Sequence, residues 1–486
     1  MIPCAKDFCL SSKGFEEKRV KESLDRSFKP SIDNDRTTSP PSRKNNTPQA
    51  VCLFHNGSSH WCFANRWAKR SSMRLNQHVA WRVLIASGLG VSLLAGAANA
   101  DVLSLNTALR LAVSQHPSVA MRLSQRDAAA ATLDVAGRGR FPAVSGQSGK
   151  DAAGKNYVTT RVEQALWTGG RLSAEIDGAD ASLRAAAAMV TESQQEIMLR
   201  AVGAYTELGR FEAATSAAQA NVAEHERLYH MILRRIDHQI TSTSDGTLAS
   251  ARLSQARAEL SQQASQGARA RARLGAVVGQ TVTDIELTPL LQAPAGALVS
   301  AIDAASAFSP VLRRLSAQED AAEAGIRLAR GQALPQVKLR HDRTRGGYQQ
   351  GNQTYLMLDY QSGAGLASLA AIGEYEARRD AVRAERMSAL LDVTDEVSAN
   401  WADLQAFEAQ MQDVQAQVVA TAQVFESFGR QYAVGRKNWI DVLNAQRELT
   451  QARYALADAK WGRLRTTLKL QLATGKLTAS TLPGLH

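Results

Sequence analysis

The most restrictive feature of this sequence is an internal repeat. Residues around Asp245 recur around Asp441 at a constant offset, 441 − 245 = 196, and the same offset relates Gln255-Ala256-Arg257 to Gln451-Ala452-Arg453. Self-similarity over such a distance indicates two copies of one supersecondary unit. The chain is therefore expected to use each of its structural elements twice.

The repeat predicts three parts in the chain after its first hundred residues: repeat 1 at 101–297, repeat 2 at 298–477 and a C-terminal tail at 478–486. Each repeat is expected to run in the order helix, two strands, long helix, turn and helix. The closing helices end at glycines, Gly279 and Gly475, which are again 475 − 279 = 196 positions apart.

Proline marks the end of the first helical segment in each repeat. These segments cover 104–137 and 298–332, and each carries a further proline after its opening turns. Phe141-Pro142 and Leu334-Pro335 follow them, and a residue before proline is disfavoured in a helix. Both segments should end there.

Short strands are predicted after each of these breaks, around polar loops that contain glycine. Apolar and polar residues alternate, as in Val337, Leu339 and His341 against Lys338 and Arg340, so one face of each hairpin is more apolar. The four predicted strands are 143–149, 157–167, 336–343 and 354–360.

Two long helices follow the strands. Neither 170–235 nor 364–430 contains proline, so each helix could run for about 100 Å at about 1.5 Å per residue. The second carries a heptad seam, which predicts a coiled coil. The seam consists of Val393, Val397, Asn400, Leu404, Phe407, Met411, Val414, Val418, Thr421, Phe425, Phe428 and Tyr432.

The leading hundred residues have a different character. Residues 1–72 are polar and without periodicity, which predicts either disorder or an extension created by the choice of start codon. Residues 73–100 have a basic start, an apolar run and Ala98-Asn99-Ala100, which is typical of a secretory signal peptide. We therefore expect the mature chain to begin at Asp101.

The net charge of +11 suggests a nucleic-acid partner, so its distribution matters. The first hundred residues hold 15 Lys/Arg and 7 Asp/Glu, which leaves 57 − 15 = 42 against 46 − 7 = 39 in the rest. All four cysteines also lie in this leading segment. The body of the protein is nearly neutral, and the sequence predicts neither nucleic-acid binding nor a disulfide or cysteine metal site there.

An exported chain of long helices with small hairpins is consistent with a membrane role. If the hairpins cross a bilayer, they must belong to a closed barrel, because an open sheet edge in lipid leaves backbone groups unpaired. Four strands are too few to close one, since bacterial barrels begin at about eight. Several subunits would then contribute strands to one barrel.

The residues resemble the TolC family of outer-membrane efflux proteins. The resemblance rests on Ala-Leu-Trp-Thr-Gly-Gly-Arg at 165–171, Tyr-Ala-Val-Gly at 432–435, Ile-Asp-Val-Leu-Asn-Ala at 440–445 and the duplicated order. It implies a mostly α fold with membrane β-structure. A homotrimer would form a twelve-stranded barrel, four strands per subunit, above an α-helical periplasmic tunnel. It also implies a periplasmic membrane-fusion adaptor, an inner-membrane ABC or proton-driven pump, and outer-membrane lipid as partners.

The same resemblance implies a periplasmic gate. Asp441 would supply a ring of acids, and Tyr432 and Lys437 would be gate-bond partners that reach toward Ser244 and Asp245. Two residues depart from the family pattern. Asn444 replaces a second ring acid, and Lys437 stands where the family has arginine, which offers a point charge in place of a bidentate fork.

The first turn also departs from the pattern. Residues 234–241 lack the usual glycine, which is similar to a branch associated with type I secretion of large proteins such as adhesins. The cargo class itself stays open among drugs, metals, peptides and proteins.

Simpler interpretations stand beside these roles. Asp441 and Asp245 each fit a helix N-cap, and Tyr432 fits core packing of the heptad seam. His225, His230 and His238 lack ligand spacing and fit a solvated face better than a metal site. The sequence contains no catalytic, cofactor or phosphate-loop motif, so an enzyme is not predicted.

The sequence thus favours a passive outer-membrane exit duct of an efflux or type I secretion system. The alternatives are a periplasmic coiled-coil adaptor or scaffold without a pore, and a trimeric surface adhesin.

Overall fold

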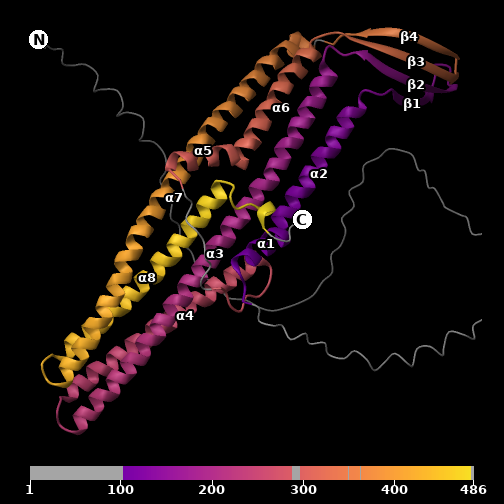
Figure 1. Ribbon diagram of the computed structural model, residues 1–486. Coiled ribbons are helices and arrows are strands. Elements are labelled where there is room, and N and C mark those ends of the chain that lie inside the picture. The colour runs from indigo at the N-terminus through magenta and orange to yellow at the C-terminus, as the bar shows by residue number, and fades with distance from the viewer. Residues whose placement is uncertain (1–101, 287–295, 349, 362, 483–486) are drawn as a thin grey trace, which may run out of the picture. The chain divides into compact units, whose positions relative to one another are not determined.

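The computed structural model describes residues 102–286, 296–348, 350–361 and 363–482 (Figure 1). The predicted extension at 1–72, the predicted signal peptide at 73–100 and residues 483–486 of the tail lie outside this part. None of the helices in the described residues contains an apolar stretch that could span a bilayer.

The same order of elements occurs in both halves. The first half contains α1 (Leu105–Gln115), α2 (Pro117–Arg138), β1 (Ala143–Lys150), β2 (Asn156–Trp167), α3 (Arg171–Asp237) and α4 (Thr243–Val278). The second half contains α5 (Leu298–Phe308), α6 (Pro310–Gln332), β3 (Gln336–Gly346), β4 (Gly351–Asp359), α7 (Ala367–Ala433) and α8 (Trp439–Ala473). Single 3₁₀ turns occur at Ala364–Leu366 and Ala479–Thr481.

Each segment predicted as one opening helix is in fact two helices. Pro117 and Pro310 occupy the first turn of α2 and α6, where the missing N–H costs nothing. The residues before them, His116 and Ser309, are N-caps whose side chains accept hydrogen bonds from the backbone N–H groups of Ser118 and Leu312. The helix therefore breaks at the proline and restarts with a satisfied cap.

The strands form one antiparallel sheet in the order β1-β2-β3-β4. Arg161 lies opposite Asp342 and Glu163 opposite Arg340, so the predicted alternation places charged residues on one face. The other face carries exposed apolar side chains, including Val144, Leu356 and Leu358. Figure 1 shows the sheet at one end of the long helices.

Helices α3 and α7 each contain 67 residues, about 100 Å at about 1.5 Å per residue. α3 packs against α4 and α7 against α8, which makes two helical hairpins. Every residue of the predicted α7 seam is buried or half-buried, so the coiled-coil prediction is confirmed at the level of the subunit.

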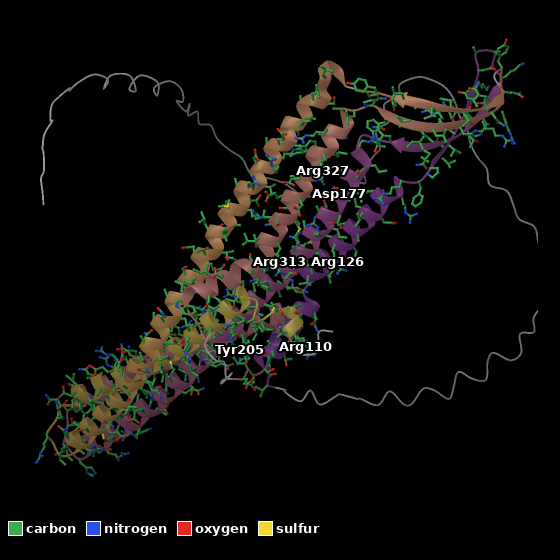
Figure 2. The ribbon with its side chains drawn as sticks, turned by 45° about the horizontal axis from the view of Figure 1, so that its top comes forward. Arg110, Arg126, Asp177, Tyr205, Arg313 and Arg327 are labelled. Atoms are coloured by element: carbon green, nitrogen blue, oxygen red, sulfur yellow. The ribbon has the colours of Figure 1, made fainter. Side chains whose placement is uncertain are left out.

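The main hydrophobic core lies where α1, α3, α4 and α8 meet. Tyr205 on α3 is fully buried there (Figure 2), and its hydroxyl donates to the carbonyl oxygens of Leu103 at 3.1 Å and Glu286 at 3.0 Å. Burial raises the pKa of this phenol, with Glu286 as a further cause. Tyr205 thereby fastens the chain entering α1 to the segment that follows α4.

Two glycines allow α8 to pack closely against α3 and α7. A Cβ at Gly209 of α3 would overlap the ring of Trp461. A Cβ at Gly462 of α8 would lie 2.5 Å from the ring of Phe407 on α7. The aromatic rings thus occupy the space that a side chain at either glycine position would need.

Candidate functional site at the two helical turns

The α3–α4 and α7–α8 turns lie together at the end of the helices opposite the sheet (Figure 1). A set of apolar side chains from all four helices joins them, and we call it the tip cluster. It consists of Leu228, Ile232, Ala249, Tyr432, Trp439, Val442 and Leu443. The predicted gate residues are therefore attached to a packed hydrophobic core.

The two turns use different residues for the same backbone conformation. Gly435 has φ 77° in the second turn, a region that glycine enters freely. In the first turn, which lacks glycine, Gln239 has φ 58°. A residue with a Cβ pays a conformational cost there, so the surrounding contacts must hold this turn in place.

Lys437 has its contacts within its own hairpin. Its Nζ lies 3.6 Å from a carboxylate oxygen of Asp441 and 4.3 Å from the centre of the Phe428 ring. The pair is partly exposed, with about a third of each side chain accessible, so solvent weakens it. Lys437 and Asp441 are thus neighbours and partly cancel each other's charge.

Tyr432 is buried in the tip cluster. Its ring centre lies 5.5 Å from that of Trp439, and the guanidinium of Arg235 lies 4.7 Å from it on the other hairpin. Core packing, the simpler interpretation, therefore applies to Tyr432. The contact with Arg235 also shows that this side chain bridges the two hairpins.

Asp245 and Asp441 are not N-caps, contrary to the simpler interpretation. The N-caps are Ser242 and Asn438, so both aspartates are the third residue of their helices. The hydroxyl of Thr241 donates to Asp245 at 2.5 Å. Both carboxylates lie in a first turn, where the helix dipole favours negative charge.

The structure places Ser244 and Asn444 on the surface. Within the described part of the subunit, neither Tyr432 nor Lys437 forms a hydrogen bond to Ser244 or Asp245. Bonds between these residues would have to form between different subunits or in a different conformation of the turns. The gate assignment therefore stays a prediction.

Glu448 is a further candidate that the sequence analysis did not identify. It is exposed and lies seven residues after Asp441 on α8, with Asn444 between them. The spacing of three and four residues places all three on one helix face. A second acid is therefore present on this face, one turn further from the tip than the pattern predicts.

A buried polar contact links the two hairpins above the tip cluster. The amide of Gln446 on α8 donates to the side-chain oxygen of Asn221 on α3 at 3.0 Å, and the hydroxyl of Thr450 donates to the same oxygen at 3.0 Å. All three side chains are at most 5% exposed. This link could not be predicted from the sequence because its partners lie 225 and 229 positions apart.

His225 lies one turn from Asn221 and is buried, so the predicted solvated face is wrong for this residue. Burial lowers the pKa of the imidazole, Glu224 on the same helix raises it, and Arg252 of α4 lowers it. His230 and His238 are exposed. No group of three or more metal-binding side chains occurs among the residues described.

We expect acid to destabilise the helical tip through His225. Between the lowered pKa and the ordinary value of 6.5, the unfolded chain binds more protons than the folded one. The free energy of unfolding therefore falls as pH drops through this window and is fully retained above it. Urea unfolding followed by circular dichroism at pH 8 and pH 5 measures this. His225→Leu should show a smaller loss, whereas an equal loss would assign the acid sensitivity to other groups.

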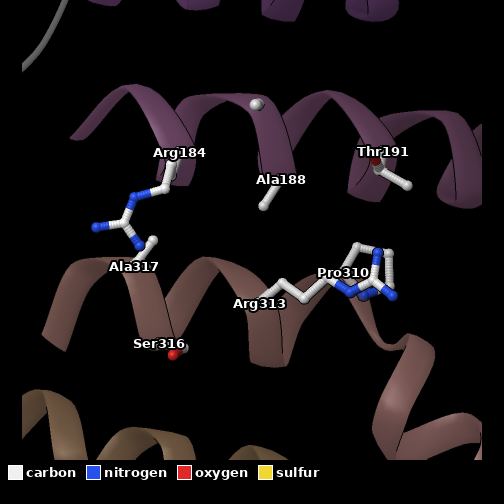
Figure 3. A pocket seen from close by; sticks show the side chains of 8 residues that line it. Arg184, Ala188, Thr191, Pro310, Arg313, Ser316 and Ala317 are labelled. Carbon is white, nitrogen blue, oxygen red and sulfur yellow. The ribbon is translucent and has the colours of Figure 1, made fainter. Parts of the chain in front are cut away.

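A cleft of about 400 Å³ lies between α3 and α6 (Figure 3). Its two arginines are engaged. Arg184 contacts Asp180 at 3.2 Å and Asp320 at 2.7 Å, and Arg313 donates to the carbonyl of Ala307 at 3.2 Å. Two carboxylates neutralise Arg184, and Arg313 is held by a backbone carbonyl, so the turns remain the stronger candidate site.

The sequence matches the family described as outer membrane efflux protein over residues 108–280 and 301–476, which together exceed half of the chain. The chain belongs to this family. The resemblance to TolC-like proteins is thus confirmed, and this outer membrane efflux protein is a channel of the outer membrane that extends into the periplasm. A comparison with curated proteins found no match.

Solved outer-membrane channels have a similar fold. The channel OprN has a TM-score of 0.69 and 20% identity, over 76% of this chain and 89% of that chain. VceC from Vibrio cholerae has 0.68 and 18%, over 76% and 96%. The open state of MtrE from Neisseria gonorrhoeae has 0.65 and 17%, over 76% and 88%. The likeness confirms the predicted fold of long helices with four strands.

Proposed function

We propose that three copies of this outer membrane efflux protein form a passive exit duct. The observation that supports this most directly is the sheet, because β1 and β4 each pair on one side only within the described subunit. Such edges are unfavourable in lipid, and four strands are too few to close a barrel. Three subunits would supply twelve strands, and the helices attached to them would continue the passage into the periplasm.

The proposed partners would supply the energy for transport and connect the duct to the inner membrane. The chain carries no nucleotide-binding motif, so energy must come from an inner-membrane ABC or proton-driven pump, connected through a periplasmic membrane-fusion adaptor. Residues 101–297 and 298–477 would be the two duplicated halves of each subunit. A pore-free adaptor or scaffold is not favoured, because the family is one of outer-membrane channels.

The gate would lie at the two turns. Asp441 and Asn444, with Glu448 beyond them, would face the passage, and Asp441 from three subunits would form a ring of negative charge. Tyr432 and Lys437 would contact Ser244 and Asp245 across subunits in the closed state. Opening would break these contacts and spread the two hairpins.

Conductance of purified trimers in planar bilayers tests this proposal. A multivalent cation such as hexamminecobalt should block the wild-type channel from the periplasmic side. Asp441→Ala with Asn444→Ala should weaken block roughly tenfold, since about 1.4 kcal/mol of lost Coulomb attraction corresponds to that factor. Glu426→Ala removes the same charge from exposed α7 surface and serves as control. Equal block in all three proteins would exclude Asp441 from the ring, and absence of conductance would exclude the duct.

A further inference from the structure

The two faces of the β-sheet differ in how their charges are balanced. On one face, here called the charged face, every cation has an acidic partner. Arg161 contacts Asp342 at 2.8 Å, Arg340 contacts Glu163 at 3.0 Å, and Lys338 lies 3.3 Å from Glu163 and 3.1 Å from Asp359. Three cations and three carboxylates cancel there.

The opposite face, here called the apolar face, carries no carboxylate on its strands. The register and the alternating exposure of β3 place Leu339, Arg343 and Arg345 on it. Near the helices this face is apolar, and its side chains are well exposed for their type. They are Val144 at 70%, Leu339 at 39%, Leu356 at 66% and Leu358 at 69%.

Three cations lie on the apolar face toward the hairpin turns, and we call them the basic collar. Arg343 and Arg345 come from β3, and Lys150 comes from the end of β1. All three are exposed, and no ion pair or side-chain hydrogen bond engages them within the described residues. Two residues along a strand span about 7 Å, so the two guanidinium groups reach neighbouring positions on the surface.

Two acids are adjacent in sequence to the basic collar: Asp342 is paired with Arg161 on the charged face, and Asp151 is occupied by the backbone. Asp151, in the β1–β2 turn, accepts hydrogen bonds from the N–H groups of Ala153 at 3.0 Å, Lys155 at 2.8 Å and Tyr348 at 3.0 Å. Its carboxylate fastens one hairpin turn to the other. The cations of the basic collar therefore lack a partner that the strands or this turn could supply.

We propose that the basic collar binds the phosphate groups of anionic lipid in the leaflet at the hairpin-turn end of the sheet. The inference rests on the proposed function, in which the apolar face contacts lipid. Apolar side chains followed along the strand by unpaired cations match hydrocarbon followed by a charged headgroup layer. Arginine suits this role because its planar guanidinium binds phosphate oxygens in pairs.

Lipid binding by the full-length trimer in uncharged detergent tests the inference. The probes are lipid A and the same lipid without its phosphates, and native mass spectrometry counts the lipid bound. We expect the wild type to prefer the phosphorylated lipid by at least about tenfold. Arg343→Gln with Arg345→Gln should lose this preference, and Arg343→Lys with Arg345→Lys should keep part of it.

The matched control is Arg234→Gln with Arg269→Gln, which removes two exposed arginines from α3 and α4. It should keep the full preference. Excess inorganic phosphate should not displace the lipid, because the acyl chains also contact the apolar face. The inference is overturned if the wild type binds both lipids equally or if the glutamine variant behaves as the wild type. Bilayer conductance of the same samples separates failure of this inference from failure of the proposed function. A trimer that conducts but shows no phosphate preference overturns this inference alone.

Discussion

Gly209→Ala is expected to lower the free energy of unfolding by about 3 kcal/mol, at the upper end of typical overpacking costs. The added methyl group would overlap the ring of Trp461, which lies against α3 from the neighbouring hairpin. Both groups are buried in the main core, so neither can move into solvent. The two hairpins would have to separate at this level.

The same substitution at Gly203 is the matched control. This glycine lies on α3 less than two turns away, and a Cβ there would meet nothing within 4 Å in the subunit. Helix propensity alone predicts that Gly→Ala stabilises by about 1 kcal/mol. Thermal unfolding of the two variants should therefore shift in opposite directions. A loss of stability in both would show that the space beside Trp461 is not what makes Gly209 necessary.

Trp439→Ala is expected to be the second severe substitution, with a loss of about 3 to 5 kcal/mol. Trp439 is 4% exposed and packs on Tyr432 at the centre of the tip cluster. Its removal leaves a cavity where all four helices of the two hairpins meet. We expect the resting conductance of the channel to rise, since this contact would hold the turns together.

Two further substitutions refine this test. Ile440→Ala, at the next position, changes a side chain that is 59% exposed and should alter neither stability nor conductance. Trp439→Phe keeps most of the packing and removes an indole N–H that is buried without a hydrogen-bond partner. It should therefore cost little. A resting conductance unchanged by Trp439→Ala would show that the tip cluster does not keep the channel closed.

Much of the fold could be predicted because its local signals are strong. Prolines end the opening helices, and alternation locates all four strands. β3 continues to Gly346, beyond the predicted Arg343, because Thr344, Arg345 and Gly346 stay paired with β2 although the apolar/polar alternation has ended. The long helices also run two or three residues further than predicted, to Asp237 and Ala433, because nothing before Gln239 or Gly435 breaks them.

The site was less accessible to sequence analysis. The pattern located both turns, but the neighbours of each side chain depend on how the two hairpins pack. Nothing near Tyr432 in the sequence indicates Arg235, and the single-helix pattern around His225 gave the wrong environment. Capping was misassigned because Ser-Thr-Ser-Asp allows several starting points for one helix.

The contact of Asn221 with Gln446 and Thr450 determines which relative movements of the hairpins are cheap. A slip of α8 by one turn would put Val442 or Tyr454 in place of one partner and strand a buried amide or hydroxyl, at about 1 to 3 kcal/mol in every subunit. Sideways displacement of the helices between this contact and the turns leaves none of its polar groups unpaired. This contact thus resists axial translation of one hairpin along the other, whereas splaying of the last few turns of helix is opposed by the tip cluster.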